Sequence, residues 1–135
     1  MASRGIRNNN PGNIRHGDKW QGLAEQQTDS SFCIFDTAEY GIRALAKILL
    51  NYQDKYKLAT VADILNRYAP ACENDTESYI YSVCLKLGVK PHDKIDVRER
   101  GIMINLLKAI IRQENGEQPY SDDVLVKAMK MAGVK

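Results

Sequence analysis

From residue 36 onward, the chain carries apolar residues at the three- and four-residue spacing of amphipathic helices. The first such stripe predicts a helix over about 37–56, and Asp36 and Glu39 have the spacing of a capping box at its start. Thr60 is placed to cap a shorter helix that ends near Tyr68. These signals predict the first two helices.

Three more helices are predicted in the rest of the chain. Asn74 is expected to cap a helix that Gly88 terminates. Asp96 is expected to start a second helix, whose apolar stripe runs to Glu114. Ser121 opens the last helix. Together with the first two, these make five predicted helices.

Residues 4–36 lack this periodicity and are rich in Gly, Asn and Pro. The run 8–13 is typical of turns, because Asn and Gly tolerate positive φ and Pro presets a turn. Residues 32–35 have the pattern of a short strand, which we expect to pair with residues near Ile14. The sequence therefore predicts a mainly α (α+β) fold in a single domain over 1–135, with a small β subregion before five helices.

Composition and charge narrow the functional classes. With 135 residues, 44% of them hydrophobic, the chain is long enough to bury a real core. Its net charge is only +2 and its Lys and Arg are scattered, which argues against nucleic-acid binding. No apolar run approaches transmembrane length, so we expect no stable membrane insertion. The polar start has no features of a signal peptide, and we expect synthesis in the cytoplasm without one.

The cysteines and histidines do not predict a metal site. Cys33, Cys72 and Cys84 are odd in number and lack the spacing of metal ligands, and the chain has only two histidines. We therefore expect reduced, buried thiols and no metal or cofactor. A cysteine–histidine amidase would pair Cys33 with His16 or His92, but Cys33 lies in an apolar run, where an inert buried thiol is favoured.

The predicted helix that ends before Gly116 carries the most informative residue of the chain. Its inward stripe consists of Met103, Leu106, Leu107, Ile110 and Ile111. The next position on that stripe is Glu114. Partial burial and the negative end of the helix dipole both favour the protonated acid, which glycosidic-bond cleavage needs. The alternative is that Glu114 is an ordinary surface residue at a helix end.

Several motifs together resemble a known group of proteins. These motifs are residues 5–15 (GIRNNNPGNIR), 20–23 (WQGL), 32–35 (FCIF) and 40–44 (YGIRA). In this order they resemble a group of small phage and prophage proteins, described as virion structural proteins or as lysozyme-like cell-wall hydrolases. The resemblance covers nearly the whole chain, including Glu114-Asn115-Gly116.

A wider similarity connects the chain to lysozyme-superfamily transglycosylases and glucosaminidases. In those enzymes a helix ends in Glu-Ser-Gly, with Glu as the catalytic acid, and an Asn-rich turn, a Trp-x-Gly segment, a short strand and a long helix follow. Here the helix ending in Glu114-Asn115-Gly116 comes late in the chain, which suggests a circular permutation. The resemblance implies a lysozyme-like domain with a cleft between lobes and Glu114 at the cleft floor.

The implied activity is cleavage of the β-1,4 bond between N-acetylmuramic acid and N-acetylglucosamine in peptidoglycan. Glu114 would be the general acid and base. Glu25, Asp29 and Asp36 are candidates for a second carboxylate, but none stands out from solvated or capping residues. This favours a lytic transglycosylase, in which a hydroxyl of the sugar attacks the anomeric carbon, and leaves a muramidase as the alternative.

Three kinds of side chain are candidates to bind the glycan. Aromatic rings stack on sugars, amides bind acetamido groups, and guanidiniums bind the carboxylates of stem peptides or orient Glu114. The candidates of these kinds are Trp20, Tyr79, Tyr120, Asn10, Asn13, Arg7, Arg15 and Arg43. Each has a structural alternative, since tyrosines pack in cores, asparagines form turns and arginines form ion pairs.

The resemblance also has consequences for partners and location. The expected partner is the glycan strand of the periplasmic cell wall, which a cytoplasmic protein reaches only after delivery by a holin, a virion or a secretion system. We expect a monomer. The competing hypothesis is a non-catalytic virion or tail protein that binds the wall or a partner protein.

Overall fold

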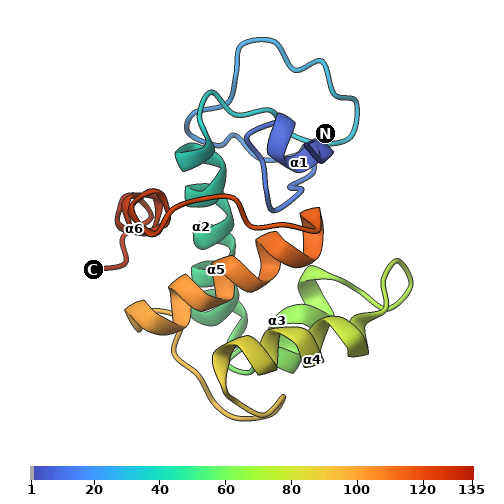
Figure 1. Ribbon diagram of the computed structural model, residues 1–135, viewed down its shortest axis with the longest axis vertical. Helices are drawn as coiled ribbons and strands as arrows, with labels where there is room; N and C mark the ends of the chain where they lie inside the picture. Colours follow the sequence, from blue (N-terminus) through green and yellow to red (C-terminus); the bar gives the residue numbers. More distant parts are fainter. Residues whose placement is uncertain (1) are drawn as a thin grey trace.

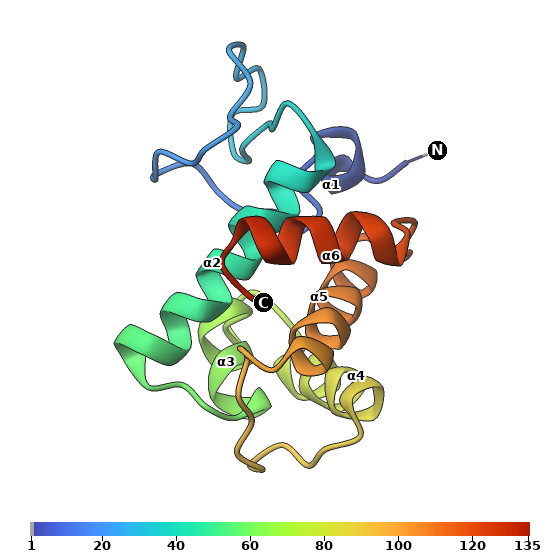
Figure 2. The ribbon, with the colours of Figure 1, turned by 90° about the vertical axis from the view of Figure 1, so that its left-hand side faces the viewer.

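The computed structural model describes residues 2–135, and this part of the chain is mainly helical, as the sequence predicts. Its helices are α1 (Arg4–Arg7), α2 (Ala38–Tyr56), α3 (Val61–Tyr68), α4 (Thr76–Leu87), α5 (Arg100–Asn115) and α6 (Asp122–Met131). Figure 1 shows the N-terminal segment at one end of the molecule and α3 and α4 at the other, with α5 between them. Figure 2 shows α6 lying across α2.

The helix ends follow the predicted chemistry at some positions. Thr60 caps α3 by accepting from the Asp63 amide, and Ser121 caps α6 in the same way. Gly88 ends α4 in the left-handed conformation, at φ 70°. The first long helix also begins where expected, but Thr37 and not Asp36 is its cap.

Two other predicted caps are wrong because neighbouring carboxylates take over. Asp75 caps α4, whereas the amide of Asn74 donates to the Pro70 carbonyl at 3.3 Å. Asp96 does not start α5, because its carboxylate accepts from the Gln53 side chain at 2.9 Å. The helix begins at Arg100, with Glu99 as its cap.

A single large apolar core lies between helices α2 to α6. The five residues predicted to form the inward stripe of α5 (Met103, Leu106, Leu107, Ile110, Ile111) are all fully buried. They pack with residues of α2 such as Leu45 and Leu49. The stripe fixes which side of α5 faces the core, and so it also fixes the direction in which Glu114 points.

The N-terminal segment has a second, much smaller core. Ile14, Cys33 and Phe35 are buried against Ala44 of α2, and Trp20 packs against this cluster. Because this cluster is small, the segment depends on other interactions for its order.

The strand predicted over residues 32–35 does not form. Within residues 2–135 the only β pairing is two isolated bridges, Arg15 with Phe32 and Leu23 with Phe35. Other groups occupy the backbone donors that a ladder would use: the Ile34 amide, for example, donates to the Gln27 side chain at 2.9 Å. The segment instead contains α1, a single turn capped by Ser3, which the sequence did not predict.

Helix α2 approaches the Asn-rich turn so closely that only glycine fits. A Cβ on Gly41 would lie 1.8 Å from the carbonyl oxygen of Asn9. The backbone of α2 is therefore in direct contact with the turn, which joins the N-terminal segment to the helices.

The cysteines follow the prediction only in part. Cys33 and Cys84 are buried, but Cys72 is exposed, because it lies in the loop between α3 and α4. No helix within residues 2–135 is long and apolar enough to cross a bilayer.

Candidate active site

Glu114 lies in the last turn of α5 and is held by side chains from two distant parts of the chain. The amide of Asn13 donates to its Oε1 at 3.0 Å. The hydroxyl of Tyr79 donates to its Oε2 at 3.0 Å. Each carboxylate oxygen can accept a second hydrogen bond, so Glu114 is oriented and still able to react. The side chain is partly buried.

Asn13 reaches Glu114 because of the turn that carries it. Its φ of 52° is left-handed, a conformation that asparagine tolerates better than most residues. The turn is fixed by Asn10, whose amide donates to the carbonyls of Ile14 and Cys33, both at 2.9 Å. Asn10 is completely buried and cannot contact a substrate. Its predicted role in substrate binding is wrong, because its side chain replaces backbone pairing inside the turn.

Asn115 attaches the end of α5 to the N-terminal segment. The hydroxyl of Ser3 donates to its Oδ1 at 2.6 Å, and its Nδ2 donates to the Pro11 carbonyl at 2.8 Å. Both contacts place the Asn-rich turn against Glu114. Gly5 makes this approach possible, since a Cβ there would lie 2.5 Å from Asn115 Oδ1.

Tyr79 holds Glu114 through its hydroxyl, and its ring does not offer a surface for sugar stacking. It is only 3% exposed. Burial, and then the negative charge of Glu114, raise the pKa of Tyr79 far above its usual value. The hydroxyl therefore stays protonated and donates to Glu114. Tyr79 therefore contacts Glu114 and orients it, but it is too buried for the predicted contact with a sugar ring.

Tyr68 is a second tyrosine near Glu114, and it contacts the Asn-rich turn. Burial and the Glu114 charge raise its pKa well above the usual value, so it too remains a donor. Its hydroxyl donates to the carbonyl of Gly12, next to Asn13. The sequence analysis did not predict a role for Tyr68 at the site, because it identified this residue only as the end of a helix.

Glu114 lies in the wall between two surface hollows. The first, of about 310 Å³, is lined by the 12–15 turn, Tyr68, Glu73 and other residues. The second, of about 390 Å³, is lined by Tyr79, Gln113 and neighbouring residues of α4. Both hollows include Glu114 and Asn74 in their walls, so they adjoin at the carboxylate, and we call the two together the groove.

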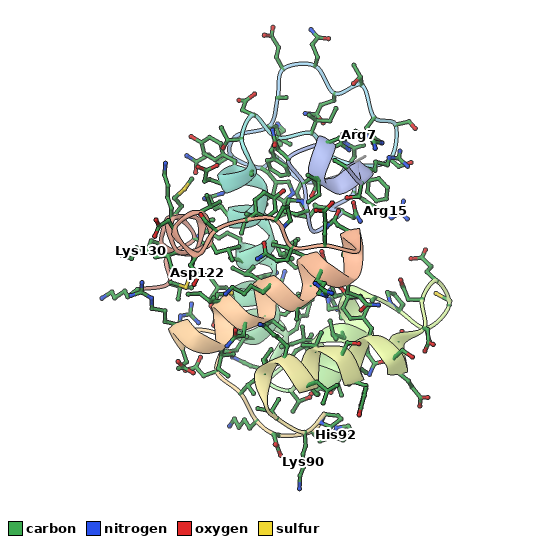
Figure 3. The ribbon with its side chains drawn as sticks, in the orientation of Figure 1. Arg7, Arg15, Lys90, His92, Asp122 and Lys130 are labelled. Carbon is green, nitrogen blue, oxygen red and sulfur yellow. The ribbon has the colours of Figure 1, made fainter. Side chains whose placement is uncertain are left out.

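Only one of the predicted arginines lies at this groove. Arg15 lines the first hollow, and its guanidinium lies 4.9 Å from the centre of the Phe32 ring. Figure 3 shows Arg15 beside the end of α5, whereas Arg7 lies further out on α1. Arg43 lines neither of the two hollows in the described chain. Its predicted contact with the site is wrong, because it leaves α2 on another side.

Trp20 and Tyr120 are also separated from Glu114. Trp20 lines a different hollow, which adjoins the first at Ile48 and Tyr52. Tyr120 packs against the main core, and burial raises its pKa to about 12. The Trp20 indole NH and the Tyr120 hydroxyl are buried without a hydrogen-bond partner among residues 2–135. Neither residue lines a hollow that contains Glu114: Tyr120 packs against the main core, whereas Trp20 lines the adjoining hollow.

None of the three predicted second carboxylates lies at the groove. Asp29 pairs with Arg4 at 2.5 Å and accepts from the amides of Ser31 and Phe32. Glu25 and Asp36 are exposed and lie outside both hollows. The carboxylate that does line the first hollow is Glu73. Sequence reasoning missed it because nothing in the polar loop between α3 and α4 indicates which element the loop faces.

Cys33 and His16 come together, but not in an arrangement suited to nucleophilic catalysis. Cys33 Sγ lies 4.0 Å from His16 Nδ1. Burial raises the pKa of the Cys33 thiol, which disfavours the reactive thiolate. The part of the chain that the structure describes contains no cluster of three or more His, Cys, Asp or Glu side chains able to hold a metal ion.

Comparison with known proteins gives one informative relative. No protein-family model matches the chain. The chain is 41% identical over 133 residues to "Protein P5" of Pseudoalteromonas phage PM2. The matched region covers 96% of this chain and 81% of that protein.

Proposed function

The chain belongs to the same family as Protein P5 of Pseudoalteromonas phage PM2, and we propose that it cleaves the glycan strands of peptidoglycan, with Glu114 as general acid and base. The target is the β-1,4 bond between N-acetylmuramic acid and N-acetylglucosamine. One observation carries the proposal: a carboxyl group held by two donors in the wall of an open groove. A carboxyl group fixed beside an open surface can exchange a proton with a bound polymer.

A lysozyme-like, circularly permuted arrangement is part of the proposal. The helix that ends in Glu114-Asn115-Gly116 comes late in the chain, yet its end contacts the Asn-rich turn near the start. In the resembling enzymes the same turn follows the catalytic helix directly. Contacts between the two segments therefore support a rearranged order with the spatial relation kept.

The chemistry needs no group beyond those of the chain and the sugar. Glu114 gives its proton to the glycosidic oxygen while the bond from that oxygen to the anomeric carbon breaks. A hydroxyl of the same sugar then bonds to the anomeric carbon, and its proton passes to the Glu114 carboxylate. Asn13 and Tyr79 keep the carboxyl group in place through both steps.

Transglycosylation is favoured over hydrolysis because neither other carboxylate of the groove is both fixed and free to react. Asp75, which lines the second hollow, is engaged in capping α4 through the amide and the hydroxyl of Ser78. Glu73 lines the groove but is exposed, and its side chain makes no hydrogen bond within residues 2–135. A nucleophile or base for water has to be fixed at a defined separation from the acid. Glu73 as a base for water is the muramidase alternative.

The decisive experiment compares Glu114→Gln with the wild type on purified peptidoglycan. Glu117→Gln is the matched control, because it removes an exposed carboxylate three residues further along. We expect Glu114→Gln to lose about a thousandfold in rate and Glu117→Gln to lose little. Equal rates for Glu114→Gln and the wild type would refute the assignment. A wild type that binds the wall but never cleaves it would favour the non-catalytic virion protein.

Product analysis separates the two reactions. Mass spectrometry is expected to find anhydro-muramoyl ends, and Glu73→Gln should keep its rate within about twofold. Reducing N-acetylmuramic acid ends, together with a loss of about a hundredfold in Glu73→Gln, would establish a muramidase instead. Reducing N-acetylglucosamine ends would refute both.

A further inference from the structure

A basic hollow continues the groove away from Glu114. It has a volume of about 700 Å³ and shares Ile48 and Tyr52 with the wall of the first hollow. Its charged lining consists of Lys19, Lys47, Lys55, Arg67 and the single carboxylate of Asp18. We call this surface the basic hollow. Because it shares walls with the first hollow, a ligand in the groove at Glu114 extends toward it.

The four cations of the basic hollow are available to a ligand. None of them takes part in an ion pair with another residue of the described chain. Tyrosine rings hold two of them: the Arg67 guanidinium lies 3.8 Å from the centre of the Tyr56 ring, and the Lys55 ammonium lies 5.3 Å from it. The positive charge is therefore positioned by aromatic faces and is not neutralised.

We propose that the basic hollow binds carboxylates of the stem peptides that hang from the glycan strand. This inference rests on the proposed substrate. The repeating sugars of the strand are neutral where a stem peptide is attached, so the negative charges of the substrate lie on its peptides. A concave site with four cations and one carboxylate complements that charge, and the shared wall places it within reach of a strand bound at Glu114.

The positive charge of the basic hollow predicts which glycan strands the protein binds more tightly. Strands whose stem peptides have free carboxylates gain contacts in the basic hollow, and strands whose carboxylates are converted to amides do not. Arg7 and Arg43, which the sequence suggested for contacts with stem peptides, line neither the groove nor the basic hollow in residues 2–135. The inference assigns these contacts to the residues of the basic hollow instead.

The test measures binding, so it does not depend on cleavage. Glu114→Gln protein is titrated calorimetrically with soluble peptide-bearing glycan strands whose carboxylates are either free or converted to amides. We expect about tenfold tighter binding of the strands with free carboxylates at low salt, and a smaller preference as salt rises. A double substitution of the exposed α2 lysines, Lys47→Glu with Lys55→Glu, should abolish the preference.

Lys130→Glu is the matched control for charge reversal. Lys130 is exposed on α6, and Figure 3 shows it on the opposite side of the molecule from Arg15. It should keep the full preference. If the double variant does not fold, the salt dependence of binding by the otherwise unaltered Glu114→Gln protein tests whether the preference is electrostatic.

The outcomes distinguish this inference from the proposed function. Equal binding of both kinds of strand, or a preference that survives the double substitution, would overturn the inference and leave the catalytic role of Glu114 intact. Tighter binding of duplex DNA or of phosphatidylglycerol vesicles than of peptide-bearing strands would also overturn it. A wild type that shows the preference but never cleaves would instead overturn the proposed function alone.

Discussion

The N-terminal segment of residues 2–36 and the helices from α2 to α6 are ordered by different forces. The helices share a large apolar core in which residues such as Leu107 and Ile110 are completely buried. The segment has only a small apolar cluster and relies on buried side-chain hydrogen bonds, above all those of Asn10. Apolar packing tolerates many sequences, whereas a buried polar network requires particular residues.

The difference explains where the candidate site lies. Glu114 ends a helix whose position is set by apolar packing, and Asn13 belongs to a turn set by hydrogen bonds. The site forms where the two regions meet, so disturbing either region should have a distinct effect on stability and on activity.

The largest expected effect is a cavity in the helical core. Leu107→Ala removes a fully buried side chain and should lower the free energy of unfolding by about 2–5 kcal/mol. Leu85→Ala, at a position that is 66% exposed, is the matched control and should change it by less than about 0.5 kcal/mol. Chemical denaturation measures both. Equal effects would show that burial in the apolar core does not determine the stability of the helical region.

A smaller and more local effect is expected from the polar region. Asn10→Ala leaves the Ile14 amide and the Cys33 carbonyl without partners, whereas the Ile14 carbonyl still accepts from the Cys33 amide; the expected cost is about 1–3 kcal/mol. Hydrogen exchange should accelerate at Ile14 and Cys33 but not in α5. Asn66→Ala, at an exposed position of α3, should change neither. Uniform acceleration throughout the protein would show that the segment is not a separate unit.

The two contacts that hold Glu114, of which the one from Asn13 crosses the boundary, should affect catalysis more than stability. Tyr79→Phe removes one donor to Glu114, and Asn13→Gly removes the other while keeping the left-handed backbone accessible. Each should lower kcat about tenfold with little change in KM. Tyr81→Phe, exposed on the same helix, is the control. A change in KM alone would mean that these side chains bind substrate and do not orient Glu114.

The smallest expected effect depends on pH. The Arg4 side chain, followed by the Phe32 amide, holds the pKa of Asp29 well below its usual value. Because the folded-state pKa is depressed, the stabilisation is present above the unfolded value of about 4 and is lost as pH falls below it.

This loss should be visible in the N-terminal segment alone. Amide exchange at Ser31 and Phe32, which donate to Asp29, should speed up as the pH falls below the unfolded-state pKa of about 4. In Arg4→Ala the loss should be smaller and should be complete at a higher pH, because the folded-state pKa of Asp29 is less depressed. No difference between the two proteins would show that the ion pair does not hold the loop.

Residue spacing along the chain is enough to predict helices α2 to α6, the buried face of α5 and the place of Glu114 on that face. These features depend on residue spacing along one helix, which the chain carries locally. The same is true of the 8–13 turn, because asparagine, proline and glycine set backbone angles by themselves.

The side chains that surround Glu114 are brought there by the tertiary fold. Its partner Asn13 is 101 residues away in sequence and Tyr79 is 35 away, and no local pattern encodes such pairs. For the same reason Asn10 was expected at the substrate and is buried, while Glu73 passed unnoticed and lines the groove. Hydrogen bonds between distant segments exist only after apolar packing has fixed the distance between them, so they follow from the fold and not from the periodicity that predicts it.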